Sequence, residues 1–124
     1  MSRLSARLRV LKMNATVYAL VASDFPGVFR YIGVTVQPLA RRLLAHCYEA
    51  GAKYDFGGTR YYGGDRRKAA WIQEVIARGA EVLIVPLVEQ LDETESRVTE
   101  RQLIAEHSPG GQLLNLQSVP PSLT

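Results

Sequence analysis

Two short strand-like runs with a turn between them stand near the start of the sequence. Residues 15–22, Ala-Thr-Val-Tyr-Ala-Leu-Val-Ala, are apolar and partly β-branched, which is typical of a buried strand. Residues 28–35 predict a second strand. Pro26 and Gly27 lie between the two runs and break regular structure, so the tight spacing predicts a β-hairpin. The apolar faces of such a hairpin need further elements to cover them.

The rest of the sequence predicts helices and one more strand. Residues 81–88 form an apolar run that predicts the third strand. Helical periodicity predicts helices over residues 2–11, 38–50, 66–78 and 93–107. The order is therefore α-β-β-α-α-β-α. The expected fold class is α+β, a small three-stranded, mainly antiparallel sheet flanked by helices.

Several residues are suited to the ends of these elements. Asp65 is suited to cap the helix over 66–78, and Gly79 is suited to end it. Pro86 cannot donate to a strand ladder, so it indicates an edge strand or a bulge. Asp92 and Glu95 have the spacing of a capping box at the start of the last helix.

The length and the charge distribution favour one domain with one basic side. We expect a basic N-terminal helix or arm over residues 1–12, a single domain over 13–117 and a loose tail over 118–124. Residues 1–12 carry +4, residues 37–70 carry +4 (seven Lys/Arg against three Asp/Glu), and residues 71–124 carry −5 (three against eight). This asymmetry suits a protein that presents one face to a polyanion, although a solvated surface of mixed charge explains the same numbers.

The sequence also excludes several classes of protein. Its single cysteine, Cys47, rules out an intrachain disulfide, and no Cys/His cluster offers a structural zinc site. The apolar runs are too short to span a bilayer, and residues 1–12 lack the apolar core of a signal peptide. We therefore expect an intracellular, cytoplasmic protein that does not associate with a membrane.

The helix predicted over 38–50 places polar side chains on an apolar stripe. That stripe consists of Leu39, Arg42, Leu43 and His46, at i, i+3, i+4 and i+7. A guanidinium on a core-facing stripe is costly unless it meets an anion, but an arginine at the edge of the stripe can extend to water. On periodicity alone, Arg41 is nearly as well placed as Arg42. His46 is suited to accept a proton or contact a phosphate, although a lone helix histidine is more often structural.

Two further polar residues stand in apolar surroundings. Glu100 lies three and four residues before Leu103 and Ile104, so its carboxylate needs a cation, a metal or hydrogen-bond donors. A salt bridge to Arg42 is the simpler alternative. Asn115 lies within an apolar run at 113–116, where a structural cap or turn is the simpler explanation.

Tyr18 and Tyr31 lie on the two strands of the predicted hairpin. Adjacent strands are about 4.8 Å apart, so two phenols on the same face can share a site. Two ordinary strand tyrosines are the commoner case.

These residues occur in an order that resembles the GIY-YIG nuclease family. Tyr31-Ile32-Gly33 matches the second half of the family's name, and Thr16-Val17-Tyr18 matches the first half except that Thr16 replaces the glycine. The family often runs through Pro-Leu into a helix with an arginine and, four residues on, a histidine. Arg42 and His46 fit that pattern, which favours Arg42 over Arg41.

The resemblance continues to the end of the domain, over about residues 15–117. Glu100, four residues before Ile104, matches the family's metal-binding glutamate, and Leu114-Asn115 matches its late asparagine. The resemblance implies hydrolysis of a phosphodiester bond in DNA with one Mg²⁺ or Mn²⁺ bound by Glu100. It also implies that Arg42 holds the scissile phosphate.

The resemblance implies roles for the other site residues too. Tyr18 or Tyr31 would take the proton from the attacking water, with His46 as an auxiliary proton acceptor or phosphate ligand. Asn115 would position water or the backbone of the site. DNA would be held by cations and aromatic residues in and around the glycine-rich segment 51–65, namely Lys53, Arg60, Tyr61, Tyr62, Arg66, Arg67 and Lys68.

Two departures from the family pattern support a second hypothesis. Thr16 replaces glycine, and Val34 stands where many members have a polar or basic residue. The alternative is therefore a catalytically inactive module that keeps the fold and binds nucleic acid. A protein–protein adaptor that uses the acidic segment 71–124 ranks third. A small nuclease domain often relies on a separate targeting protein or domain, so the expected partners are DNA and such a targeting component.

Overall fold

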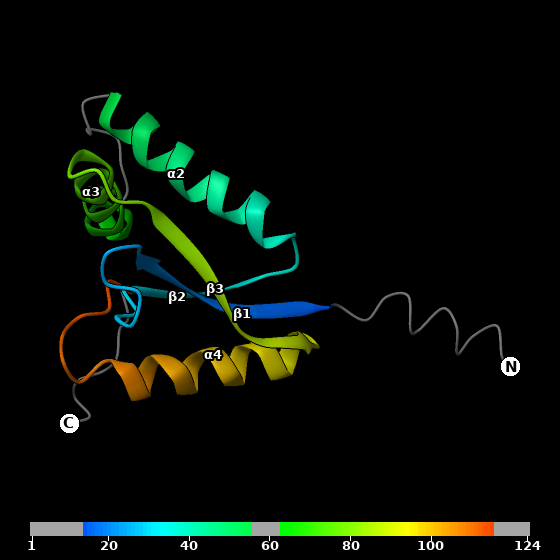
Figure 1. The fold of residues 1–124 in the computed structure, drawn as a ribbon. Helices are drawn as coiled ribbons and strands as arrows, with labels where there is room; N and C mark the ends of the chain where they lie inside the picture. The colour runs from blue at the N-terminus through cyan, green and yellow to red at the C-terminus, as the bar shows by residue number, and fades with distance from the viewer. Residues whose placement is uncertain (1–13, 56–62, 116–124) are drawn as a thin grey trace, which may run out of the picture.

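A computed structural model describes residues 14–55 and 63–115 of the chain. The elements follow the order β1 (Ala15–Ala22), β2 (Tyr31–Thr35), α2 (Leu39–Asp55), α3 (Gly63–Ala77), β3 (Val82–Leu91) and α4 (Glu93–His107). The helix expected over residues 2–11 and the tail expected over 118–124 lie outside the described residues. Within the described part, the α+β prediction is confirmed (Figure 1).

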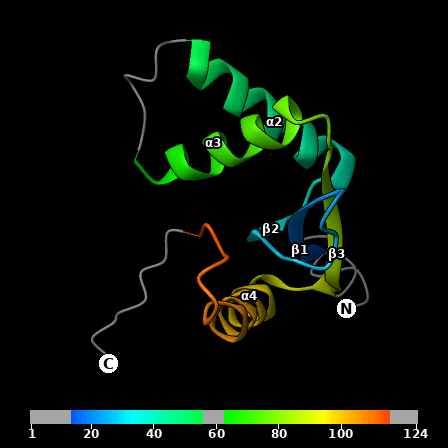
Figure 2. The same ribbon diagram turned by 60° about the vertical axis from the view of Figure 1, so that its left-hand side comes forward.

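The three strands form one antiparallel sheet in the order β2-β1-β3. Helices α2 and α3 cover one face of the sheet, and α4 covers the other (Figures 1 and 2). The central strand β1 is therefore buried on both faces, which explains its nearly continuous apolar sequence. Tyr18 and Leu20 pack toward α2 and α3, whereas Val17 and Ala19 pack toward α4, as the two-residue period of a strand requires.

Some boundaries agree with the sequence prediction and others differ. The first strand and the last helix have the predicted limits. The second strand begins at Tyr31 rather than at residue 28, because the chain turns at residues 23–28 before the ladder starts. Helix α2 continues to Asp55, beyond the predicted end at residue 50. Helix α3 begins at Gly63, so Asp65 is its third residue and the prediction of Asp65 as the cap is wrong.

The predicted end signals elsewhere are confirmed. Gly79 has a φ of 85°, and its N–H donates to the carbonyl of Ile76 (3.0 Å) just beyond α3. Pro86 lies in the edge strand β3, next to an irregularity in the pairing with β1. The Asp92 carboxylate accepts from the N–H of Glu95 (2.8 Å), and the Glu95 carboxylate accepts from the N–H of Asp92 (2.9 Å), which completes the capping box.

In the described part of the chain, no helix combines the length and the hydropathy needed to cross a membrane.

Candidate active site

Four of the predicted site residues meet on one face of the sheet. Tyr18 comes from β1, Tyr31 from β2, and Arg42 and His46 from successive turns of α2. The ring centroids of the two tyrosines are 6.5 Å apart, and those of Tyr31 and His46 are 5.4 Å apart. Because α2 packs on the face that Tyr18 occupies, an arginine and a histidine four residues apart both reach the phenols.

A chain of hydrogen bonds connects three of these side chains. The Tyr18 hydroxyl and Nε2 of His46 are 2.8 Å apart, and Nε of Arg42 donates to the same hydroxyl over 3.3 Å. Arg41 is exposed on α2, so the structure supports Arg42 as the inward-facing arginine. Tyr18 and His46 are each only 1% exposed, and Arg42 is half-buried. The Tyr18 hydroxyl, Nε2 of His46 and Nε of Arg42 therefore satisfy one another in a region with little water.

Burial sets the protonation states within this cluster. It lowers the pKa of His46 to about 3, and the nearby charges of Lys68 and Arg42 act in the same direction. His46 is therefore a neutral imidazole near pH 7, and its Nδ1 is buried without a hydrogen-bond partner. Burial also raises the pKa of Tyr18, and the hydrogen bond from Arg42 offsets this only in part. These shifts make Tyr18 a neutral phenol and exclude His46 as a cationic ligand for phosphate.

Gly33 is required because the Tyr18 ring lies directly over it. The two residues face each other across the β1–β2 ladder. A Cβ at position 33 would lie 2.6 Å from the Tyr18 hydroxyl oxygen and 3.0 Å from the ring of Tyr31. Any larger residue would displace one of the two phenols. The glycine of Tyr31-Ile32-Gly33 thus lets both tyrosines pack closely at the site.

Lys68 lies beside the tyrosine cluster. We expected it among the cations that hold DNA around the glycine-rich segment, whereas it is only 8% exposed and its Nζ lies 4.5 Å from the centroid of the Tyr31 ring. Its spacing could have revealed this, because Trp71, Ile72 and Val75 follow at i+3, i+4 and i+7 and are buried. Lys68 is therefore a cation on an apolar stripe, as Arg42 is on α2.

Glu100 lies on α4, the helix on the sheet face opposite α2, and is half-buried. Among the described residues, no ion pair or hydrogen bond joins it to Arg42, so the simple salt-bridge alternative is not observed. Burial raises the pKa of the Glu100 carboxyl, and the charges of Arg97 and Arg101 act against this rise. Burial is the main cause of the raised pKa of Tyr18, and the charge of Glu100 adds a smaller contribution in the same direction.

Asn115 holds the backbone of the site rather than facing into it. Its Oδ1 accepts from the N–H of Ile32 (2.9 Å), and its Nδ2 donates to the carbonyl of Ile32 (2.8 Å). Next to it, the N–H of Leu114 donates to the carbonyl of Arg30 over 2.6 Å. The segment at 114–115 therefore pairs with the outer edge of β2, which fixes the residues on either side of Tyr31. Of the two roles expected for Asn115, positioning of the backbone fits these contacts.

The expected DNA-binding residues are only partly described. Arg66 and Arg67 are exposed on α3. Lys53 lies in α2, but the position of its side chain is outside what the structure describes. Three further expected residues, Arg60, Tyr61 and Tyr62, lie outside the described residues.

Comparison with known proteins adds no further assignment. No family model, curated protein or solved structure matches the chain. The geometry of the site is therefore the basis for its chemistry. That geometry combines a phenol beside an ammonium group, a guanidinium fixed by a second phenol, and a half-buried carboxylate on the opposite helix.

Proposed function

We propose that this chain is a metal-dependent DNA endonuclease with a GIY-YIG-like site. The observation that carries the proposal is the convergence of Tyr18, Tyr31, Arg42 and His46 from three elements into one cluster. Burying two phenols, a guanidinium and an imidazole together costs free energy, so packing alone does not explain their convergence in one poorly hydrated region. Hydrolysis of a phosphodiester needs a base for water and a cation for the phosphate, and this cluster supplies both.

Tyr31 is the better candidate for the general base. The Tyr18 hydroxyl already has two hydrogen-bond partners and is almost fully buried, so it serves to hold Arg42 and His46 in place. Tyr31 is half-buried, and the ammonium group of Lys68 lies close to its ring. A cation at this distance is placed to stabilise negative charge that develops on the phenol as it takes a proton from water.

Arg42 is the candidate ligand for the scissile phosphate. Its Nε is fixed by Tyr18, and a guanidinium has five N–H donors in one rigid fork. The hydrogen bond to Tyr18 therefore orients the remaining donors before DNA arrives, so that less entropy is lost on binding. His46 supports this arrangement as a neutral partner of Tyr18.

Glu100 is the residue that would hold the metal. Within residues 14–55 and 63–115, no group of three His, Cys, Asp or Glu side chains is placed to bind an ion. Mg²⁺ does not need such a group, because it usually keeps several waters and binds through one or two carboxylates plus substrate phosphates. A half-buried carboxylate such as Glu100 fits this requirement. When bound, Mg²⁺ or Mn²⁺ would stabilise negative charge on the phosphate and the leaving oxygen.

The proposal extends to the partners of the enzyme. DNA would contact the exposed Arg66 and Arg67 on α3, the helix that also carries Lys68. Target selection would come from a separate targeting protein or domain, and the expected location is the cytoplasm.

One observation favours a second candidate, an inactive nucleic-acid-binding module of the same fold. Tyr18 and His46 are so deeply buried that they can be read as a polar network that stabilises the core. This alternative predicts DNA binding that weakens with salt, but no metal-dependent cleavage.

The deciding experiment is cleavage of supercoiled plasmid with Mg²⁺ or Mn²⁺, with EDTA as the control. Cleavage should require the metal, and Glu100→Gln should raise the metal concentration needed and reduce the rate at least about tenfold. Glu106→Gln is the matched control, because Glu106 is an exposed carboxylate on the same helix. DNA binding without cleavage by the wild-type protein would leave the inactive module as the better assignment.

A second pair of variants tests Lys68 as a residue that acts on Tyr31. Lys68→Met should lower the cleavage rate and shift its pH profile to higher pH, with little loss of DNA affinity. Arg67→Met should weaken DNA binding and leave the pH profile unchanged, because Arg67 is exposed. Identical pH profiles for Lys68→Met and the wild-type protein would exclude this role for Lys68.

A further inference from the structure

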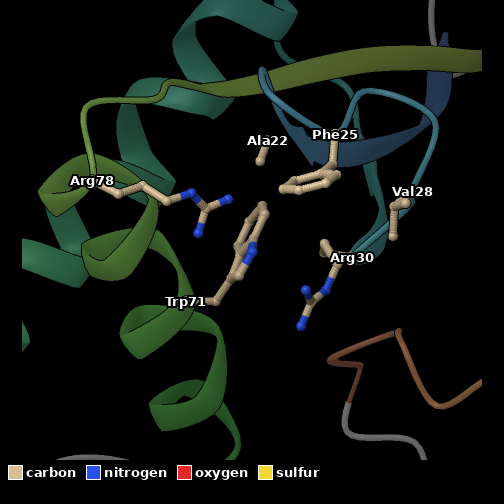
Figure 3. A pocket seen from close by; sticks show the side chains of 6 residues that line it. All are labelled: Ala22, Phe25, Val28, Arg30, Trp71 and Arg78. Carbon is tan, nitrogen blue, oxygen red and sulfur yellow. The ribbon is translucent and has the colours of Figure 1, made fainter.

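A pocket of about 240 Å³ lies between the β1–β2 turn and α3 (Figure 3). It is lined by Ala22, Phe25, Val28, Arg30, Trp71 and Arg78. Phe25 is 60% exposed at the turn, whereas Trp71 is 5% exposed and forms part of the core. The pocket thus has a buried aromatic wall, an exposed aromatic wall and two guanidinium groups beside them. None of these residues has a role in the catalytic cluster described above.

The two arginines of the pocket differ in their charge balance. Arg78 forms a bidentate ion pair with Asp24, in which Nε and Nη2 donate to the two carboxylate oxygens over 2.9 and 3.0 Å. Nη1 of Arg78 lies 3.9 Å from Oε2 of Glu74. Arg30 donates its Nε to the backbone carbonyl of Gln112 over 2.9 Å. No ion pair among the described residues involves Arg30. The guanidinium of Arg30 is therefore fixed at the pocket without an acidic partner in the described part of the chain. It is available to bind an anionic group of a ligand.

The pocket borders the candidate active site. Arg30 directly precedes Tyr31 in the chain, and Trp71 lies one helical turn after Lys68 on α3. The guanidinium carbon of Arg30 lies 5.6 Å from the Trp71 ring centroid, just as Nζ of Lys68 lies 4.5 Å from that of Tyr31. The two cation–aromatic pairs are therefore neighbours, because Arg30 and Tyr31 are adjacent in the chain and Lys68 and Trp71 lie on successive turns of α3.

We propose that this pocket binds an unpaired nucleotide next to the scissile phosphate. The base stacks on the Phe25 ring at the mouth of the pocket, with Trp71 as the inner wall, and Arg30 contacts the adjoining phosphate. Aromatic faces and guanidinium groups accept any nucleobase without reading its sequence. The volume lies below the range of about 300–1,000 Å³ that is usual for drug-sized ligands, which suits one flat base. The inference rests on the proposed nuclease function and specifies its substrate class, DNA with an unpaired base at the cleavage position.

The fluorescence of Trp71 provides a direct test, because it is the only tryptophan in the sequence. Three DNAs would be titrated in EDTA, which keeps them intact. One is a blunt duplex, the second is the same duplex with one unpaired nucleotide, and the third has an abasic site at that unpaired position. Phe25→Ala is the test variant, and Tyr48→Ala is the matched control because Tyr48 is an exposed aromatic residue on α2, outside the pocket.

The wild-type protein should bind the duplex with the unpaired base at least about fivefold more tightly than the other two DNAs, with a change in Trp71 emission. Phe25→Ala should remove this preference and leave the affinity for the blunt duplex unchanged. Tyr48→Ala should keep the preference. Equal wild-type affinities for all three DNAs would overturn the proposal even if Phe25→Ala failed to fold, and so would a Phe25→Ala protein that retains the preference.

This experiment separates failure of the pocket from failure of the nuclease assignment. If the wild-type protein cuts blunt duplex in Mg²⁺ but shows no preference for the unpaired base, the pocket proposal is contradicted and the nuclease assignment is not. If the wild-type protein binds none of the three DNAs, both the pocket proposal and the nuclease assignment are contradicted.

Discussion

Acidification should destabilise this protein through His46. The ring is 1% exposed and faces Tyr18, Tyr31, Arg42 and Lys68, so protonation would add a charge beside two cations in a region with little water. The pKa of His46 is about 3 in the folded protein, whereas an unperturbed histidine has a pKa of about 6.5. Between these two values, the unfolded chain binds the proton and the folded chain does not.

The sign and the size of the effect follow from this difference. Because the unfolded state binds more protons, the free energy of unfolding falls as the pH falls from about 6.5 toward 3. Each pH unit within this window costs about 1.4 kcal/mol, so acidification from pH 7 to pH 4.5 costs about 2.5 kcal/mol through His46 alone. Above pH 7 the contribution of His46 is constant. A loss of this size is a large fraction of the stability of a small domain.

Urea denaturation at several pH values, followed by Trp71 fluorescence, measures this loss. Carboxyl groups also titrate in the window, so the informative quantity is the difference between wild-type protein and His46→Gln in their loss of stability from pH 7 to pH 4.5. We expect His46→Gln to lose about 2.5 kcal/mol less than wild-type protein. His107→Gln is the matched control, because His107 is the other histidine of the sequence and is exposed. Parallel losses in wild-type protein and His46→Gln would refute the reasoning.

Two further predictions concern the packing and the backbone of the site. Gly33→Ala should reduce the free energy of unfolding by about 1–3 kcal/mol, because its methyl group would lie 2.6 Å from the Tyr18 oxygen. Gly27→Ala should have little effect, since a methyl group at position 27 would meet no atom within 4 Å, and equal denaturation midpoints for the two variants would contradict the steric argument. Asn115→Ala should cost about 1–3 kcal/mol because it removes both hydrogen bonds to the backbone of Ile32. Hydrogen exchange should show faster exchange at the Ile32 amide in this variant, and unchanged protection there would show that Asn115 is not what holds that strand edge.

Local sequence signals predicted much of the fold. The helix over 93–107 was predictable because its capping box and its apolar spacing agree. The strand over 15–22 was predictable because a strand buried on both faces is apolar throughout. The start of α3 was not, because Gly63 and Gly64 have low helix propensity and therefore do not predict a helix. Helix propensity is a weak guide at such a boundary. Asp65 was a misleading cap signal because α3 begins two residues before it.

The site was predictable only where one element defines it. Helical spacing identified His46 but left Arg41 and Arg42 as alternatives, and the family resemblance favoured Arg42. The contact of Arg42 and His46 with Tyr18 followed from helix α2 covering that face. The spacing of Lys68 from Trp71 and Ile72 could have indicated its burial, but its position beside Tyr31 depends on how α3 packs on the sheet. The pairing of Asn115 with Ile32 joins residues 83 positions apart. Contacts of this kind depend on the tertiary arrangement rather than on periodicity.

The rate at which Arg42→Ala nicks supercoiled plasmid in Mg²⁺ tests the central claim most directly. Arg41→Ala is the matched control, since Arg41 is the exposed neighbour on the same helix. We predict that wild-type protein and Arg41→Ala nick the plasmid at similar rates, and that Arg42→Ala is slower by about 100-fold, the loss expected when a donor to developing negative charge is removed. An Arg42→Ala protein that folds normally and nicks the plasmid at the wild-type rate would contradict the assignment of this cluster as the active site.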